Sequence, residues 1–89
     1  MYKYFVEFLG TLLFISTIAF TGNPALILAS LGVAIGLGGK ISGGHFNPAI
    51  STWAWLSSKL STADYGMYIL MQSAAAGLVW ILSEVSSGS

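Results

Sequence analysis

Three long apolar segments, which together carry a single charge, constrain what this chain can fold into more than any other feature. They cover residues 4–20, 25–39 and 65–82. About 20 predominantly apolar residues are long enough to cross the hydrocarbon core of a bilayer as a helix. The middle segment is shorter, about 22 Å at roughly 1.5 Å per residue, and crosses only if residues 22–24 also enter the bilayer. The pattern predicts an all-α integral membrane protein with three transmembrane helices.

The composition supports this class and excludes several functions. Of the 89 residues, 55% are hydrophobic and 7% charged, whereas soluble domains carry roughly 25% charge. Three lysines balance three acidic residues, so we expect no nucleic-acid partner. The chain has no cysteine, which excludes disulfides and thiolate metal sites. Its one histidine, His45, cannot form a metal centre or a catalytic site alone, so we expect no metal, no cofactor and no enzyme activity.

The first two apolar segments are separated by Thr-Gly-Asn-Pro at residues 21–24, a turn-forming sequence. Proline suits the first turn of the following helix, where its missing N–H is not needed. We therefore expect helices over about residues 3–21 and about 24–39. A secretory signal peptide is the alternative for the first segment, because Lys3 precedes an apolar run. Against it, no small-x-small cleavage site follows Phe20 before the turn.

Aromatic residues flank the third apolar segment. Tyr65 and Tyr68 stand near one end and Trp80 near the other, as in the aromatic belts at the two membrane interfaces. We expect a helix over about residues 64–84, which makes residues 1–85 one structural unit. Residues 86–89, Ser-Ser-Gly-Ser, are typical of a flexible tail or of the scar of a truncation.

The segment between the second and third membrane helices, residues 41–58, begins with the polar sequence ISGGHFNPAI. Asn47 and Pro48 suit the cap and first position of a helix. About two turns follow, roughly 12 to 15 Å or half a membrane. Gly43 and Gly44 free the preceding backbone to adopt positive φ. Such backbone is tolerated in a membrane only where protein buries it or where it lines a water-filled cavity, so we expect a re-entrant loop and half-helix beside a cavity.

Residues 42–49, SGGHFNPA, resemble the first-repeat signature of the aquaporin family of major intrinsic proteins. The surrounding sequence agrees: EFLGT at 7–11, the glycine-rich run to Gly39, and YILMQSAAAG at 68–77 resemble the first three helices of the family. That fold has two inverted repeats, each of three helices and one half-helix. The resemblance covers one repeat and does not include a second Asn-Pro-Ala or the arginine that follows it.

The resemblance implies passive conduction of water or small uncharged solutes. A half-helix ending near the membrane midplane presents unsatisfied N–H groups and about half a positive charge to the pore. Backbone carbonyls before it accept hydrogen bonds from water, and the Asn47 amide donates to its oxygen. Twenty residues before Asn47, Ile27 occupies a filter position that is often aromatic, which argues against strict water selectivity. The implied pore residues are Asn47, Pro48, Ala49, Gly43, Gly44, His45 and Ile27.

Two ionisable residues need partners inside the membrane, because a charged group there costs at least about 2.5 to 3.5 kcal/mol. We expect Glu7 and His45 to form a hydrogen bond with each other and hold the loop, as an equivalent glutamate does in the family. Gln72 is expected to bind the loop backbone. The alternative for Glu7 is an interfacial side chain that reaches the headgroups.

Small and aromatic residues suggest further contacts. Gly32 and Gly36 allow close helix packing, and we expect the second helix to pack on the third near residues 74–77, with a dimer motif as the alternative. Trp53 and Trp55 are expected to anchor the end of the half-helix at the membrane interface.

One half-helix supplies one side of a constriction, so the implied pore needs a partner. We expect a homo-oligomer built from antiparallel pairs, or a separately encoded second half. Lys3, Lys40 and Lys59 all fall on one side of the membrane, which favours a single orientation, whereas dual insertion favours a balanced count. The alternative function is a non-conducting scaffold or a lesion-forming small membrane protein.

Overall fold

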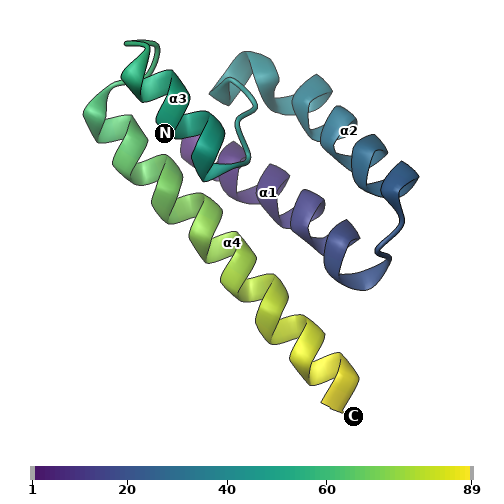
Figure 1. The fold of residues 1–89 in the computed structure, drawn as a ribbon. Helices are drawn as coiled ribbons and strands as arrows, with labels where there is room; N and C mark the ends of the chain where they lie inside the picture. Colours follow the sequence, from purple (N-terminus) through teal and green to yellow (C-terminus); the bar gives the residue numbers. More distant parts are fainter. Residues whose placement is uncertain (1, 89) are drawn as a thin grey trace.

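The computed structural model describes residues 2–88, which form four helices joined by short connections (Figure 1). These are α1 (Tyr2–Phe20), α2 (Pro24–Ser42), α3 (Pro48–Leu56) and α4 (Thr62–Gly88). Three of them, α1, α2 and α4, are long and apolar enough to cross a membrane. The expected all-α fold, with three membrane helices and one short helix, is confirmed.

Helix α1 lies between α2 and α4, and α3 packs along the first half of α4 (Figure 1). Within residues 2–88, the backbones of α2 and α4 do not pack against each other, although the Tyr68 hydroxyl of α4 reaches the carbonyl of Ser42 at the end of α2. The expected packing of α2 on α4 through Gly32 and Gly36 is therefore wrong, and both glycines face open space. The physical reason is that α2 presents its other small-residue face to α1. The buried residues on that face are Ser30, Ala34, Gly38 and Ser42.

Two helix ends lie beyond the expected positions. Helix α2 continues past residue 39 and ends before Gly43, which has a left-handed conformation and donates its N–H to the carbonyl of Gly39 at 2.8 Å. Helix α4 continues to Gly88, so residues 86–88 are helical rather than a tail. The hydroxyl of Ser86 donates to the carbonyl of Leu82 at 2.8 Å, which lets a serine remain inside a helix. Ser89 lies outside the described residues.

An ionic cluster joins the first turn of α1 to the first turn of α4. The Lys3 Nζ lies 2.6 Å from Oδ2 of Asp64, and the Tyr4 hydroxyl donates to Oδ1 of the same carboxylate at 2.6 Å. The ring of Tyr4 also meets that of Tyr68 edge to face, with centroids 6.1 Å apart. The cluster therefore fixes the N-terminal ends of the first and last membrane helices side by side.

Aromatic residues tie the end of α3 to α4. The indole of Trp55 stacks on the ring of Tyr65 with centroids 4.6 Å apart and donates to Oγ1 of Thr62 at 3.0 Å. Trp53 is 57% exposed, and the Lys59 ammonium lies 4.7 Å from its ring centroid. Trp55 thus joins two helices, whereas Trp53 has the exposure that an interfacial anchor needs.

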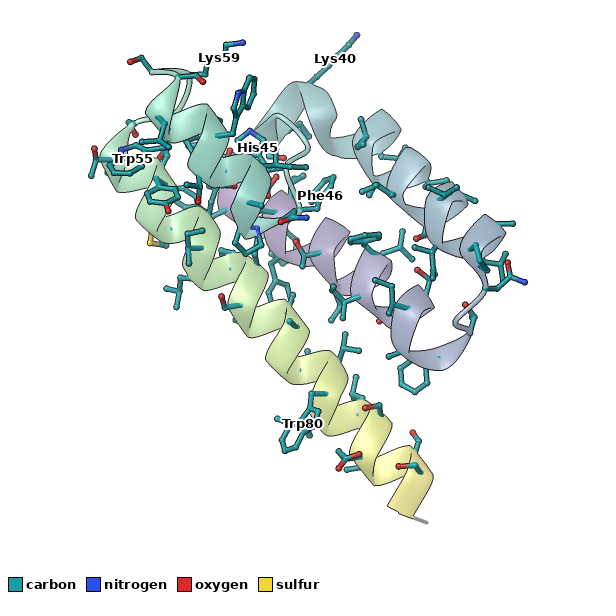
Figure 2. The ribbon with its side chains drawn as sticks, viewed as in Figure 1. Lys40, His45, Phe46, Trp55, Lys59 and Trp80 are labelled. Atoms are coloured by element: carbon teal, nitrogen blue, oxygen red, sulfur yellow. The ribbon has the colours of Figure 1, made fainter. Side chains whose placement is uncertain are left out.

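The remaining charges divide between the two ends of the molecule. Lys40 and Lys59 project from the end where α2 and α3 finish, and Trp80 lies toward the opposite end (Figure 2). Glu84 is exposed near the C-terminal end of α4. One end of the helix bundle is therefore positive and the other carries an acidic residue.

We expect Asp64→Asn to lower the melting temperature of the protein in detergent micelles by a few degrees. The substitution removes the ion pair with Lys3, and the Tyr4 hydroxyl then donates to an amide oxygen, which is a weaker acceptor than a carboxylate. Thermal unfolding followed by circular dichroism measures the effect. Glu84→Gln is the matched control, because it neutralises an exposed carboxylate on the same helix. Equal melting temperatures for the two variants would contradict a stabilising role of the cluster.

Candidate functional site

The connection between α2 and α3 turns sharply through three residues with positive φ. These are Gly43 at 92°, Gly44 at 65° and Phe46 at 54°. Glycine adopts this region without steric cost, as expected for the first two positions. A phenylalanine there is uncommon. The loop therefore leaves the end of α2, reverses direction and starts α3 at Pro48.

The carboxylate of Glu7 lies under this loop and is 0% exposed. Its Oε2 accepts hydrogen bonds from the Ser42 hydroxyl at 2.7 Å and the His45 N–H at 3.1 Å. Its Oε1 accepts from the Phe46 N–H at 2.8 Å and from Nε2 of Gln72 at 2.9 Å. Four donors on two oxygens match an ionised carboxylate. The alternative of an interfacial Glu7 is therefore wrong.

The contact between Glu7 and His45 exists, but through the backbone of His45 rather than its ring. The imidazole Nδ1 instead lies 2.9 Å from Oγ of Ser51, on α3. Gln72 donates to the same Oγ at 2.8 Å and does not bind the loop backbone as expected. Loop N–H groups bind the carboxylate in place of the imidazole, and the amide of Gln72 bridges the carboxylate and Ser51. Ser51 Oγ therefore has one partner from the loop and one from α4.

Sequence reasoning missed three of the residues that hold the loop. Ser42 and Ser51 are buried, and each binds a side chain from another helix. Tyr68, expected in an aromatic belt, is 2% exposed, and its hydroxyl donates to the carbonyl of Ser42 at 2.5 Å. The available signal was periodicity: Tyr68 and Gln72 are four residues apart and share one face of α4.

Asn47 caps the half-helix as expected. Its Oδ1 accepts from the N–H of Ala49 at 2.8 Å, and Pro48 is the first helical residue. This cap leaves the Nδ2 donors of Asn47 without a hydrogen bond among residues 2–88. In the first turn of α3, Pro48 has no N–H and the N–H groups of Ala49 and Ser51 bond to Asn47, so the Asn47 side-chain amide is the main donor left at the start of the helix.

Ile27 is the expected pore residue that the structure does not bring to the loop. It lies in the first turn of α2, whereas the loop leaves the last turn of the same helix. Its role at a filter stays a prediction. The cavity between α1 and α2, which Phe46 lines, has almost entirely apolar walls. It is therefore not the water-filled cavity expected beside the loop.

We expect Glu7→Gln to destabilise the fold by about 3 kcal/mol, because an amide NH2 replaces one oxygen that accepts two hydrogen bonds. Thermal unfolding in micelles measures the loss. The exposed Glu84→Gln serves again as control and is expected to unfold like the wild type. Wild-type stability in Glu7→Gln would show that the carboxylate is not needed to hold the loop.

Comparison with known proteins gives an independent assignment. The family model described as Major intrinsic protein matches residues 1–87. The chain is 36% identical over 85 residues to the glycerol uptake facilitator protein-like 6 of Lactiplantibacillus plantarum, a match covering 81% of this chain and 38% of that protein. It is 37% identical over 79 residues to an aquaporin Z of Flavobacterium johnsoniae, covering 72% of this chain and all of that protein.

A third relative, aquaporin Z of Brucella melitensis, is 31% identical over 105 residues, a match that covers 97% of this chain and 46% of that protein. The chain thus spans less than half the length of two of these three relatives. No solved structure gives a significant match. The family match over nearly all of the sequence, together with three helices long and apolar enough to cross a membrane, shows that this integral membrane protein belongs to the major intrinsic protein family.

Proposed function

We propose that this chain forms one half of a channel that passes water or small uncharged solutes down their gradient. The observation that carries the proposal is the capped start of α3, where Asn47 keeps its amide donors free while Glu7 holds the loop before it. The family membership supports a channel rather than an enzyme, and two of the relatives are named aquaporins and one a glycerol facilitator.

The chemistry of conduction follows from the groups that the loop offers. The helix N-terminus at Pro48 and Ala49 carries about half a positive charge, which repels cations. Asn47 donates hydrogen bonds to the oxygen of the passing molecule. The carbonyls of Gly43, Gly44 and His45 would accept its hydrogens. A neutral molecule with both donors and acceptors is therefore favoured over an ion.

A single chain supplies one side of this constriction. Helix α3 has nine residues, about 13 Å at roughly 1.5 Å per residue, less than half of a hydrocarbon core of about 30 Å. A second half-helix is needed to extend the path through the other leaflet. We assign it to a second copy of the chain in antiparallel orientation, related by a two-fold axis in the membrane plane.

The lysines favour a single orientation at insertion, but the charges at the two ends of the molecule favour contact between antiparallel copies. Lys3 is paired with Asp64, which leaves Lys40 and Lys59 as the unpaired lysines of the described residues. Both lie at the end opposite to the exposed Glu84 (Figure 2). In an antiparallel pair, the acidic end of each copy lies at the same membrane surface as the lysine end of the other, where opposite charges attract.

We expect proteoliposomes with the wild-type protein to shrink faster than empty vesicles under osmotic stress, and Asn47→Asp to lose most of this permeability. Aspartate caps a helix as well as asparagine but has no N–H donor and adds a negative charge. Stopped-flow light scattering measures the rate.

Asn23→Asp is the matched control, because Asn23 caps α2 in the same way at the exposed turn between α1 and α2. It is expected to conduct like the wild type. Wild-type permeability equal to that of empty vesicles would refute the channel. Leakage of ions without size selection would instead indicate a lesion-forming protein.

For the antiparallel pair, we expect both ends of the molecule to be reachable from outside intact cells. Single cysteines can be placed at Ser57→Cys, after α3, and Ser87→Cys, near the end of α4, because the chain has no native cysteine. Each variant should react with an impermeant maleimide in about half of its molecules. Labelling of one position alone would exclude self-pairing and require a separate second half.

A further inference from the structure

Phe46, the residue directly before Asn47, is held in an unusual position. It is 1% exposed, has a φ of 54°, and donates its N–H to Glu7 at 2.8 Å. A side chain at positive φ persists only where its surroundings stabilise that conformation. The hydrogen bond to Glu7 fixes the backbone nitrogen of Phe46, but any residue other than proline could make this bond, so it does not explain why the side chain is a large aromatic ring.

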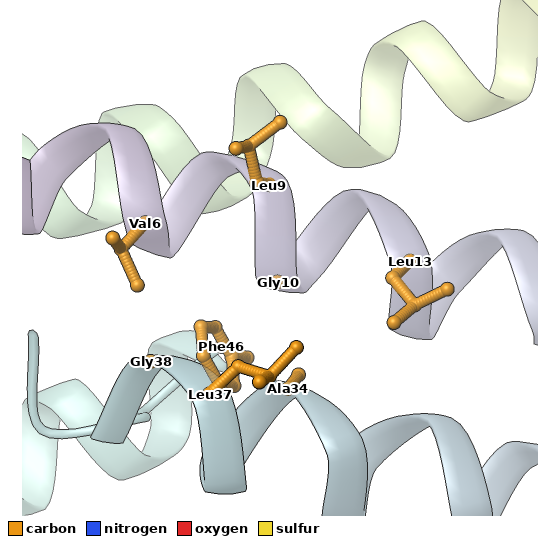
Figure 3. A pocket seen from close by; sticks show the side chains of 8 residues that line it. All are labelled: Val6, Leu9, Gly10, Leu13, Ala34, Leu37, Gly38 and Phe46. Carbon is orange, nitrogen blue, oxygen red and sulfur yellow. The ribbon is translucent and has the colours of Figure 1, made fainter. Parts of the chain in front are cut away.

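The ring of Phe46 occupies space left by a glycine of α1. A Cβ atom added at Gly10 would overlap Cε1 of the ring and lie 2.5 Å from Cδ1 and Cζ. A Cβ atom added at Gly38, on α2, would lie 3.5 Å from Cζ, which is ordinary van der Waals contact. The ring therefore fits between α1 and α2, and Gly10 is where its fit is tightest (Figure 3).

Free space adjoins the ring. An apolar cavity of about 230 Å³ lies between α1 and α2, with Phe46 in its wall (Figure 3). A ring displaced from Gly10 therefore has room to move toward Leu13 and Leu37, which also line the cavity. Because Phe46 is bonded to Asn47, such a movement would shift the start of α3. The absence of a Cβ atom at Gly10 is what allows the ring to lie where it does.

We propose that the Phe46–Gly10 contact is a size-matched positioning element that sets where Asn47 lies at the start of α3. The carboxylate of Glu7 holds the loop backbone through hydrogen bonds, and the ring of Phe46 holds the loop through close packing against Gly10. The effect of this contact on transport rests on the proposed channel function, whereas its effect on the loop does not.

A double-mutant cycle between the two residues tests the contact. Gly10→Ala is expected to lower osmotic permeability about tenfold, within the range seen for coupled neighbours. Phe46→Leu removes Cε1 and Cζ, and we expect a smaller loss from it alone. The double variant is expected to recover to within about twofold of Phe46→Leu, because leucine lacks the atoms beyond Cδ and can rotate its Cδ atoms away from the added methyl group. Gly77→Ala, a matched change inside α4 that faces open space, should conduct like the wild type.

A spectroscopic measurement tests the Phe46–Gly10 contact independently of whether the protein conducts. The chain has one histidine, so the ¹⁵N resonances of its imidazole in micelles report on His45 alone, whose Nδ1 is paired with Ser51. Gly10→Ala should shift these resonances, and adding Phe46→Leu should return them toward their original positions. Gly77→Ala should leave them unchanged. If wild-type vesicles are impermeable, the channel proposal fails and this cycle still decides on the contact.

The contact would be refuted by His45 resonances that do not respond to Gly10→Ala, or by effects of the two substitutions that simply add. If Gly10→Ala does not fold, a folded double variant supports the size match, and an equally unfolded double variant overturns it.

Discussion

The buried carboxylate of Glu7 is the interaction on which the rest of the structure depends. A re-entrant loop carries backbone N–H groups into a medium without water, and each unpaired group there costs several kcal/mol. A carboxylate in the same medium needs donors. Glu7 and the loop meet both requirements at once, since Oε1 and Oε2 each accept one loop N–H. For this reason α1 lies in the middle of the bundle, next to both α2 and α4.

Helix α3 is held firmly on the side facing its own chain, and this defines which groups would remain for a molecule that passes the proposed channel. Ser51 is fixed by His45 and Gln72, and Thr52 lies 2.8 Å from the hydroxyl of Tyr65. These contacts fall on the fourth and fifth residues of α3. The amide donors of Asn47, at the start of the helix, are left unoccupied. The same packing that immobilises α3 therefore presents its polar N-terminus outward.

The fold is one-sided, which gives the proposed pairing its physical basis. Helix α3 is too short to reach through half of a hydrocarbon core, and α2 leaves the face that carries Gly32 and Gly36 uncovered. The unpaired lysines lie at one end and Glu84 near the other. An antiparallel second half would complete the path and bring opposite charges to the same membrane surface.

The sequence by itself determined the features that depend on neighbouring residues. The three apolar segments, the asparagine–proline starts of α2 and α3, and the glycines of the turn all follow from local hydropathy, capping and backbone freedom. The tertiary structure decided the partners of the polar groups. Glu7 binds residues 35 to 65 positions away in sequence, and neither the orientation of the His45 ring nor the burial of Tyr68 follows from its neighbours. The fit of Phe46 against Gly10 likewise exists only once α1 and the loop are packed together.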